Sequence, residues 1–281
     1  MSVVWFNGEF IEGTLPLDPH DRGLLLGDGI FETVAVINQK PLWLDEHLQR
    51  MSHGAEELGL ALDAENLFSA LTAVLRRSDA QFEVLRITLS RGKTTRGLGG
   101  NGASSSLLIT LDEFDAGNLF QPCRLKVSTV RRNELAPSSR LKTLSYIDGI
   151  AAAREVAADA DDALMLNTAG YVASTAIANI FMLRGKQLIT PRLDQGILAG
   201  ITRHVLLGNA KKFGLLPIEK IVQLEDLFSA DAVFLCNSLR FIRPVTTLNN
   251  ETLGTRSLDG LRDGLSAIAK QHCGIDLRDL N

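Results

Sequence analysis

The stretch Arg140-Leu-Lys-Thr-Leu-Ser-Tyr146 contains Lys142, the residue from which the fold and the chemistry of this chain can be worked out. By residue type alone, Lys142 is expected to be a surface lysine at the start of a helix, because lysines are mostly exposed. The alanine-rich residues 145–160 predict that helix. A lysine amine acts as a nucleophile only when burial or a nearby charge lowers its pKa. The role of Lys142 therefore has to be inferred from other stretches of the sequence.

Length and composition limit the class of protein. A chain of 281 residues with 45% apolar and 22% charged residues is typical of a globular protein with two domains. The net charge of −4 argues against a general nucleic-acid binder, which would carry a basic excess. We find no apolar run of the roughly 18 residues that a membrane helix needs, and no secretory signal at the start. The cytoplasm is the expected compartment.

The cysteines and histidines carry no recognisable motif. The cysteines at positions 123, 236 and 273 are far apart, which fits neither a disulfide framework nor a paired zinc site. The five histidines show no spacing typical of metal ligands. We therefore expect no metal site.

Residues 1–113 predict an α+β domain. Asn7-Gly8 lies between two short apolar stretches and suits a type I′ hairpin turn. Residues 44–60 and 66–77 repeat apolar side chains every three or four positions, as amphipathic helices do. Three apolar segments are strand candidates: 30–37, 82–89 and 106–111.

Residues 114–122 have the polar, turn-forming composition of a linker, and residues 123–281 predict a larger α/β domain. Strand and helix patterns alternate in this second part. The predicted strands are 125–130, 163–166, 179–183 and 232–235, and the predicted helices are 145–160, 202–213 and 258–270.

Gly97-Leu-Gly-Gly-Asn-Gly102 matches the glycine pattern of dinucleotide-binding proteins, but a strand pattern follows it instead of the helix that the motif requires. We interpret it as a loop between strands. Its cations Arg91, Lys93 and Arg96 either meet an anionic substrate or are ordinary solvated charges.

Four further stretches accompany the Lys142 segment. They are Asp21-Arg-Gly-Leu-Leu-Leu-Gly-Asp-Gly-Ile-Phe-Glu-Thr33, Gly170-Tyr-Val-Ala-Ser-Thr-Ala-Ile-Ala-Asn-Ile-Phe181, Gly196-Ile-Leu-Ala-Gly-Ile-Thr-Arg203 and Phe234-Leu-Cys-Asn-Ser-Leu-Arg-Phe-Ile-Arg-Pro-Val245. In this order, the five stretches resemble the class IV aminotransferases, the fold-type-IV pyridoxal phosphate enzymes. The resemblance implies a D-amino acid aminotransferase-like fold, a pyridoxal 5′-phosphate cofactor and a homodimer in which the loop around Arg96 reaches toward the neighbour's site.

The resemblance also implies roles for individual residues. Lys142 occupies the Schiff-base position, and Tyr146, four residues on, is expected to share a helical face with it and to hydrogen-bond the phenolic oxygen of the cofactor. Arg50, Ile201, Thr202 and Ser238 are expected to hold the cofactor phosphate. The beginning of a helix at residues 200–203 suits a dianion, because unpaired amides and the positive end of the helix dipole lie there.

One position departs from the family pattern. Most members have a glutamate at the fifth position of the Gly170 segment, where its carboxylate keeps the pyridine nitrogen protonated and makes the ring a strong electron sink. This chain has Ser174 there. A serine cannot balance a positive charge, so full transamination is expected to be slowed.

Three activities follow from the resemblance. Residues 90–98, 192–195 and 230–239, together with 244–245, look most like the branch that eliminates pyruvate from 4-amino-4-deoxychorismate, leaving 4-aminobenzoate for folate synthesis. In that reading Lys142 moves protons, and Thr33 and Arg96 meet the departing enolpyruvyl unit or a carboxylate. An aminotransferase acting on D- or branched-chain amino acids is the alternative. A catalytically weak pyridoxal phosphate-binding protein is the third reading, made possible by Ser174.

Overall fold

The computed structural model describes residues 2–99, 105–254 and 256–280, and the chain divides into two compact units. The first unit contains the residues up to 116 together with 142–145 and 269–280, and the second contains 117–141 and 146–268. Residues 142–145 and 269–280 therefore belong to the first unit, although they lie within the 123–281 range predicted for the second domain. Among the described residues, no helix is both long enough and apolar enough to cross a membrane.

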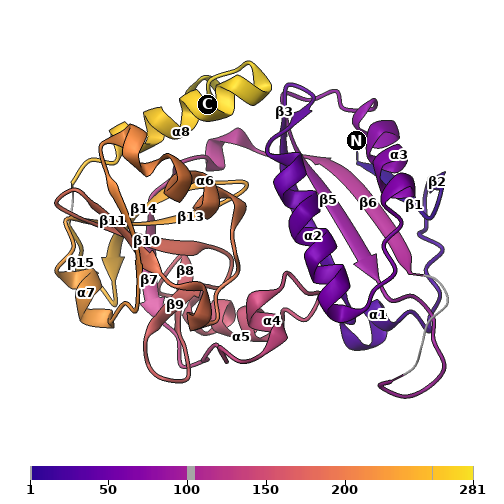
Figure 1. The fold of residues 1–281 in the computed structure, drawn as a ribbon, viewed down its shortest axis with the longest axis horizontal. Coiled ribbons are helices and arrows are strands. Elements are labelled where there is room, and N and C mark those ends of the chain that lie inside the picture. Colours follow the sequence, from indigo (N-terminus) through magenta and orange to yellow (C-terminus); the bar gives the residue numbers. More distant parts are fainter. Residues whose placement is uncertain (1, 100–104, 255, 281) are drawn as a thin grey trace. The chain divides into compact units, whose positions relative to one another are not determined.

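The first unit is built on a six-stranded antiparallel sheet in the order β2-β1-β6-β5-β3-β4 (Figure 1). Its strands are β1 Val3–Phe6, β2 Glu9–Phe10, β3 Gly29–Ile37, β4 Lys40–Pro41, β5 Phe82–Ser90 and β6 Ser106–Glu113. Its helices are α1 Arg22–Leu26, α2 Leu44–Leu58 and α3 Ala64–Leu75. The predicted α+β architecture is confirmed, including the hairpin at Asn7-Gly8, where both residues have positive φ.

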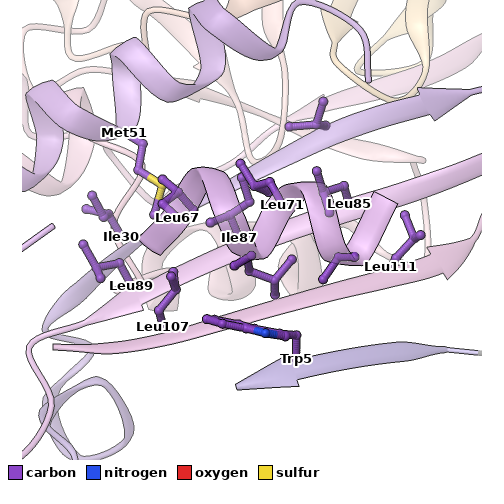
Figure 2. Packing of buried hydrophobic residues seen from close by; sticks show 14 of the residues in the cluster. Trp5, Ile30, Met51, Leu67, Leu71, Leu85, Ile87, Leu89, Leu107 and Leu111 are labelled. Carbon is purple, nitrogen blue, oxygen red and sulfur yellow. The ribbon is translucent and has the colours of Figure 1, made fainter. Parts of the chain in front are cut away.

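One face of this sheet packs against α2 and α3. Side chains alternate between the two faces of a strand, so Ile30, Val34 and Val36 of β3 point the same way. They join Met51 of α2 and Leu71 of α3 in a core of fully buried side chains (Figure 2). By the same alternation Glu32 points toward α2, which gives a carboxylate an unusual place among apolar neighbours.

The second unit contains a nine-stranded mixed sheet in the order β12-β11-β10-β13-β14-β7-β8-β9, with β15 paired to β14. The pairs β11–β12, β14–β7 and β7–β8 are parallel, and the others are antiparallel. The strands are β7 Cys123–Val127, β8 Asp162–Leu166, β9 Val172–Thr175, β10 Asn179–Arg184, β11 Gln187–Pro191, β12 Leu216–Lys220, β13 Ala232–Asn237, β14 Phe241–Leu248 and β15 Glu251–Thr252.

Helices and a few single turns connect these strands. The helices are α4 Pro137–Arg140, α5 Ile147–Val156, α6 Ile201–Asn209, α7 Leu224–Phe228 and α8 Asp259–Cys273, and the 3-10 turns are η1 Ala116–Asn118, η2 Leu193–Gln195, η3 Ala210–Phe213 and η4 Leu277–Leu280. The end of α8 and η4 belong to the first unit. The combination of strands and helices agrees with the α/β class expected for this part of the chain.

Several strands were not predicted from the sequence. β14 contains Arg243 and Pro244, which mask its apolar pattern, yet Arg243 is buried and the strand pairs with β13 and β7. β9 is only four residues long and contains Ser174 and Thr175, so it shows no apolar pattern long enough to predict a strand. Tertiary pairing, and not local pattern, makes these segments strands.

Candidate active site

Lys142 lies in an extended segment that is attached to β3. The amide of Phe31 donates to the carbonyl of Lys142 at 2.9 Å, and the amide of Leu144 donates to the carbonyl of Gly29 at 2.9 Å. Gly29 permits this close approach, because a Cβ there would lie 2.7 Å from the Leu144 side chain and 2.5 Å from the Leu89 carbonyl oxygen. The backbone thus fixes Lys142 at one edge of the strand.

The expected helical relation between Lys142 and Tyr146 is wrong. Helix α5 begins at Ile147, with Tyr146 as its N-cap residue, so Lys142 precedes the helix by several extended residues. The two side chains therefore do not share a helical face. Pairing with β3 explains the difference, since it holds residues 142–144 extended before the alanine-rich sequence can continue the helix.

The ammonium group of Lys142 lies over an aromatic ring. Its Nζ is 4.4 Å from the centroid of Phe31, and the guanidinium carbon of Arg86 is 3.9 Å from the same centroid. Thr33 is two residues beyond Phe31 on the same side of β3 and pairs in register with Arg86. The amine is half-buried, and Phe31 limits where it can point.

On the α2 side of β3, Glu32 is the centre of a buried polar cluster. Arg50 donates to it twice, from Nε at 2.8 Å and from Nη2 at 2.6 Å, and His47 Nδ1 lies 2.7 Å from Oε2. Glu32 is 1% exposed and His47 is fully buried. Burial raises the pKa of the Glu32 carboxyl, but the hydrogen bonds from Arg50 and His47 outweigh this effect and lower the pKa to about 2.

The charge of Glu32 determines which ring nitrogen of His47 carries the proton. An ionised carboxylate only accepts hydrogen bonds, so His47 must carry its proton on Nδ1. Burial lowers the pKa of His47, and the positive charges of Arg50 and Lys142 act in the same direction, while Glu32 opposes them. His47 is therefore a neutral imidazole near Lys142. Sequence reasoning missed this cluster, although Glu32 stood within the quoted Asp21 segment.

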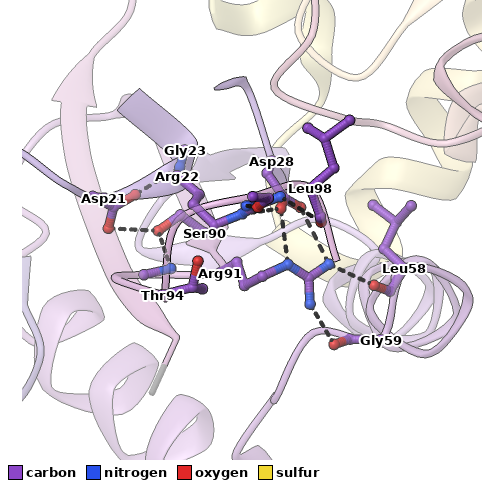
Figure 3. Close-up of polar contacts among 12 residues, drawn as sticks. Asp21, Arg22, Gly23, Asp28, Leu58, Gly59, Ser90, Arg91, Thr94 and Leu98 are labelled. Carbon is purple, nitrogen blue, oxygen red and sulfur yellow. Dashed lines mark hydrogen bonds and ion pairs between the residues drawn. The ribbon is translucent and has the colours of Figure 1, made fainter. Parts of the chain in front are cut away.

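A second polar cluster holds the start of the loop that follows β5 (Figure 3). Asp28 accepts from Arg22 at 2.7 Å and from Arg91 at 2.8 Å, and Arg22 also donates to the carbonyls of Gly97 and Leu98. Lys93 pairs with Asp18 at 3.2 Å. Arg91 and Lys93 thus have acidic partners within the protein.

Arg96 differs from these two cations. It is exposed and makes no hydrogen bond or ion pair with any residue that the structure describes. Part of the glycine-rich stretch, residues 100–102, lies outside the described residues. The substrate-binding role expected of Arg96 remains a prediction.

In the second unit, the first turn of α6 carries the features that a phosphate requires. Thr202 is 1% exposed, and its Oγ1 has no hydrogen-bond partner among the described residues. A helix begins with amides that have no partner inside the helix, and those of residues 201–203 are such amides. A buried hydroxyl without a partner beside these amides fits an oxyanion.

Gly200, the N-cap of α6, lies against the side chain of Asn179. A Cβ at this position would lie 2.0 Å from Oδ1 of Asn179, whose side-chain amide donates to the carbonyl of Leu198 at 3.0 Å. Asn179 thereby shapes the turn before the helix. Ser238, which follows β13 after Asn237, is partly buried.

Ser174 lies in β9 opposite Met165 of β8, and it is 5% exposed. Its hydroxyl donates to the carbonyl of Thr175 at 3.1 Å. Tyr146 is half-buried at the start of α5, which packs on β8. The predicted site residues therefore divide into Lys142, Thr33, Arg50 and Arg96 in the first unit and Tyr146, Ser174, Ile201, Thr202 and Ser238 in the second.

No cluster of three or more potential metal ligands occurs among the described residues. His47 is hydrogen-bonded to Glu32. Burial raises the pKa of the Cys123 thiol to about 11 and that of the Cys236 thiol to about 12. Two of the cysteines are therefore protonated and poor ligands.

Comparison with known sequences gives a consistent picture. The family model described as "Amino-transferase class IV" matches residues 29–248. The chain is 29% identical to the aminodeoxychorismate lyase of Bacillus subtilis over 262 residues, which cover 91% of this chain and 89% of that protein. It is 26% identical to the D-alanine aminotransferase of Bacillus licheniformis over 257 residues, covering 90% of each.

Solved structures resemble the chain over nearly its whole length. A protein from Legionella pneumophila named "Putative 4-amino-4-deoxychorismate lyase" has 31% identity and a TM-score of 0.84, and the match covers 92% of this chain and 96% of that one. The branched-chain amino acid aminotransferase from Escherichia coli has a TM-score of 0.87 at 21% identity, covering 97% and 95%. The latter likeness concerns the fold alone.

Proposed function

This chain belongs to the class IV aminotransferase family of pyridoxal phosphate-dependent enzymes, and from that premise we propose that it eliminates pyruvate from 4-amino-4-deoxychorismate to give 4-aminobenzoate. One observation carries the choice: relatives named for this activity match at 29% and 31% identity over about nine tenths of the chain. Ser174 supports it, since a lyase reaction that restores an aromatic ring tolerates a weaker electron sink.

Pyridoxal phosphate, when bound, supplies an electron sink for the substrate amine. Lys142 is the residue that we propose to attach the cofactor and to move protons, because its backbone is fixed on β3 and its amine lies over the Phe31 ring. In the elimination, the ring carbon loses a proton, the C–O bond to the enolpyruvyl group breaks, and the released enolate takes up a proton on its methylene carbon and becomes pyruvate. In this proposal Lys142 carries these protons.

The remaining roles follow from chemistry. Thr33 would meet the enolpyruvyl unit and Arg96 a substrate carboxylate, since a hydroxyl and a guanidinium match these groups. Tyr146 would hold the phenolic oxygen of the cofactor. We also propose a homodimer, for which the exposed Leu24 and Leu25 of α1 offer apolar surface, at 61% and 58% exposure.

We propose that Ile201, Thr202 and Ser238 bind the cofactor phosphate together with Arg50. The buried Oγ1 of Thr202 and the amides of α6 support this assignment. Two of the three guanidinium nitrogens of Arg50 donate to Glu32, so Arg50 would act as a guanidinium already oriented by a buried carboxylate.

Replacing Arg50 by alanine should weaken cofactor affinity by roughly 1.5–3 kcal/mol, the range for a charged hydrogen bond. The measurement is the dissociation constant of pyridoxal phosphate, obtained by fluorescence titration of the apoprotein. Arg76→Ala, which removes an exposed arginine at the end of α3, is the control. An unchanged dissociation constant in Arg50→Ala would remove Arg50 from the phosphate site.

The reaction itself is tested with the purified protein in the presence of pyridoxal phosphate. We expect 4-amino-4-deoxychorismate to yield equal amounts of pyruvate and 4-aminobenzoate, while D-alanine and L-branched-chain amino acids react slowly. Absorbance near the band of the lysine-bound cofactor is followed during each addition. Rapid reaction with an amino acid and no 4-aminobenzoate would identify an aminotransferase instead, and cofactor binding without turnover would identify a binding protein.

Ser174→Glu should increase half-transamination of amino acids in a single turnover. A carboxylate at this position would stabilise a protonated ring nitrogen, which strengthens the electron sink. Stopped-flow absorbance measures the rate, and Ser174→Ala is the control that lacks both the carboxylate and the hydroxyl. If the unmodified protein already transaminates at typical enzyme rates of about 1–10³ per second, this electronic account is wrong.

A further inference from the structure

Arg132 is a partly buried arginine that shares a hydrogen-bond acceptor with Ser174. Its Nη2 donates to the carbonyl of Thr175 at 3.1 Å, and its backbone amide donates to the carbonyl of Leu166 at 2.9 Å. Its Nε is buried without a hydrogen-bond partner among the described residues. A guanidinium has five N–H donors and remains charged in proteins, so this position holds a positive charge that few local groups satisfy.

Arg132 and Ser174 share one acceptor. The hydroxyl of Ser174 also donates to the carbonyl of Thr175, again at 3.1 Å. Two donors on one oxygen must be near one another, and a charge within about 4–6 Å of a titrating group shifts its pKa. Nη2 of Arg132 is thus no more than about 6 Å from the Ser174 hydroxyl, the range over which a charge acts on a titrating group.

No carboxylate among the described residues forms an ion pair with the guanidinium of Arg132. Tyr146, Asp148 and Asp162 are the titratable groups that act on Arg132, and burial still lowers the pKa of its guanidinium. Within the described residues, none of these forms an ion pair with Arg132. Asp162 accepts from the amide of Ala163, and burial raises the pKa of its carboxyl, which weakens it as a counter-ion.

We propose that Arg132 is a positioning residue that keeps the pyridine nitrogen of the cofactor unprotonated at Ser174, whose hydroxyl would turn from the Thr175 carbonyl to donate to that nitrogen. The inference rests on the proposed cofactor site and deepens it. A second positive charge on the ring nitrogen would face the guanidinium in a site of low polarity, where like charges repel strongly. The pair of Ser174 and Arg132 thus replaces a carboxylate with a hydroxyl and a cation, and it selects reactions that need only a modest electron sink.

The experiment reconstitutes the protein with pyridoxal phosphate labelled with nitrogen-15 in the ring, and the nitrogen chemical shift is recorded between about pH 5 and pH 9. The shift distinguishes a protonated from an unprotonated ring nitrogen without any turnover. We expect an unprotonated nitrogen throughout in the unmodified protein. In Arg132→Met, which keeps an apolar stem but removes the charge, the pKa of the ring nitrogen should rise by roughly one to two units.

Two variants serve as controls. Arg131→Met removes the neighbouring arginine, which is exposed, and should leave the nitrogen shift unchanged. Arg132→Lys keeps the charge and should keep the nitrogen unprotonated even if the hydrogen bond to Thr175 is lost. If Arg132→Met does not fold, the comparison of Arg132→Lys with Arg132→Gln gives the same test, because only the second removes the charge.

The outcomes separate this inference from the proposed function. A protonated nitrogen in the unmodified protein, or the same pKa in Arg132→Met and Arg131→Met, would overturn the role of Arg132 while leaving the cofactor site intact. A protein that binds no labelled cofactor, or binds it without forming a borohydride-reducible bond to Lys142, would overturn the proposed function and this inference together.

Discussion

Lys142→Ala is expected to lower turnover by about 10³–10⁶-fold, the range found when a residue that combines nucleophilic and proton-transfer roles is removed. The cofactor should still associate, because the proposed phosphate contacts of α6 do not involve this lysine. Covalent attachment should be lost. The measurement is the rate of 4-aminobenzoate formation, together with borohydride reduction and peptide mass mapping, which in the unmodified protein should place the adduct on Lys142.

Lys186→Ala is the matched control, since Lys186 is exposed and lies in the turn between β10 and β11. Its activity and labelling should equal those of the unmodified protein. An adduct on any lysine other than Lys142, or full activity in Lys142→Ala, would contradict the assignment. The fixed geometry of Lys142 on β3 makes compensation by another lysine difficult, because the backbone bonds to Phe31 and Gly29 hold this one segment in place.

Glu32→Ala is expected to reduce the free energy of unfolding by about 3–5 kcal/mol, because it leaves Arg50 and His47 without their shared partner in a buried site. Glu32 is 1% exposed and receives hydrogen bonds from both residues. The measurement is urea unfolding followed by circular dichroism. Glu56→Ala, which removes an exposed carboxylate of α2, should change stability by no more than about 0.5 kcal/mol.

The same cluster predicts how stability depends on acid. The pKa of Glu32 is lowered from 4.5 to about 2 in the folded protein. Folding therefore favours the ionised form, and the contribution, about 3 kcal/mol, is fully present above pH 4.5 and is lost as the pH falls toward 2. Glu32→Gln should remove this part of the acid dependence. An identical pH profile in Glu32→Gln would show that other carboxylates govern acid unfolding.

Local sequence determined the regular elements with strong periodicity. Helix α2 was expected at residues 44–60 and occupies Leu44–Leu58, ending at Gly59, which has the left-handed conformation typical of a helix end. The hairpin of β1 and β2 and the strands β3 and β5 were also expected. In each case the signal lies within a few consecutive residues, so neighbouring side chains alone specify the conformation.

The order of the motifs along the chain also sufficed to identify the family, and it singled out Lys142, Ser174 and Thr202 as candidates. What it could not supply was their surroundings. The helical relation assumed between Lys142 and Tyr146 failed because β3 captures residues 142–144, a contact with residues more than a hundred positions away. Propensity favoured a helix, and backbone pairing overrode it.

Only the tertiary structure decided which charges stand alone and which are paired. Glu32 contacts His47 and Arg50 of α2, which are 15 and 18 residues further along the chain. Arg132 donates to the carbonyl of Thr175, which is 43 residues further along. A sequence states that a side chain can ionise. Whether it does so, and what it does to its neighbours, depends on burial and on distances of a few ångströms, which arise only when separate strands and helices pack together.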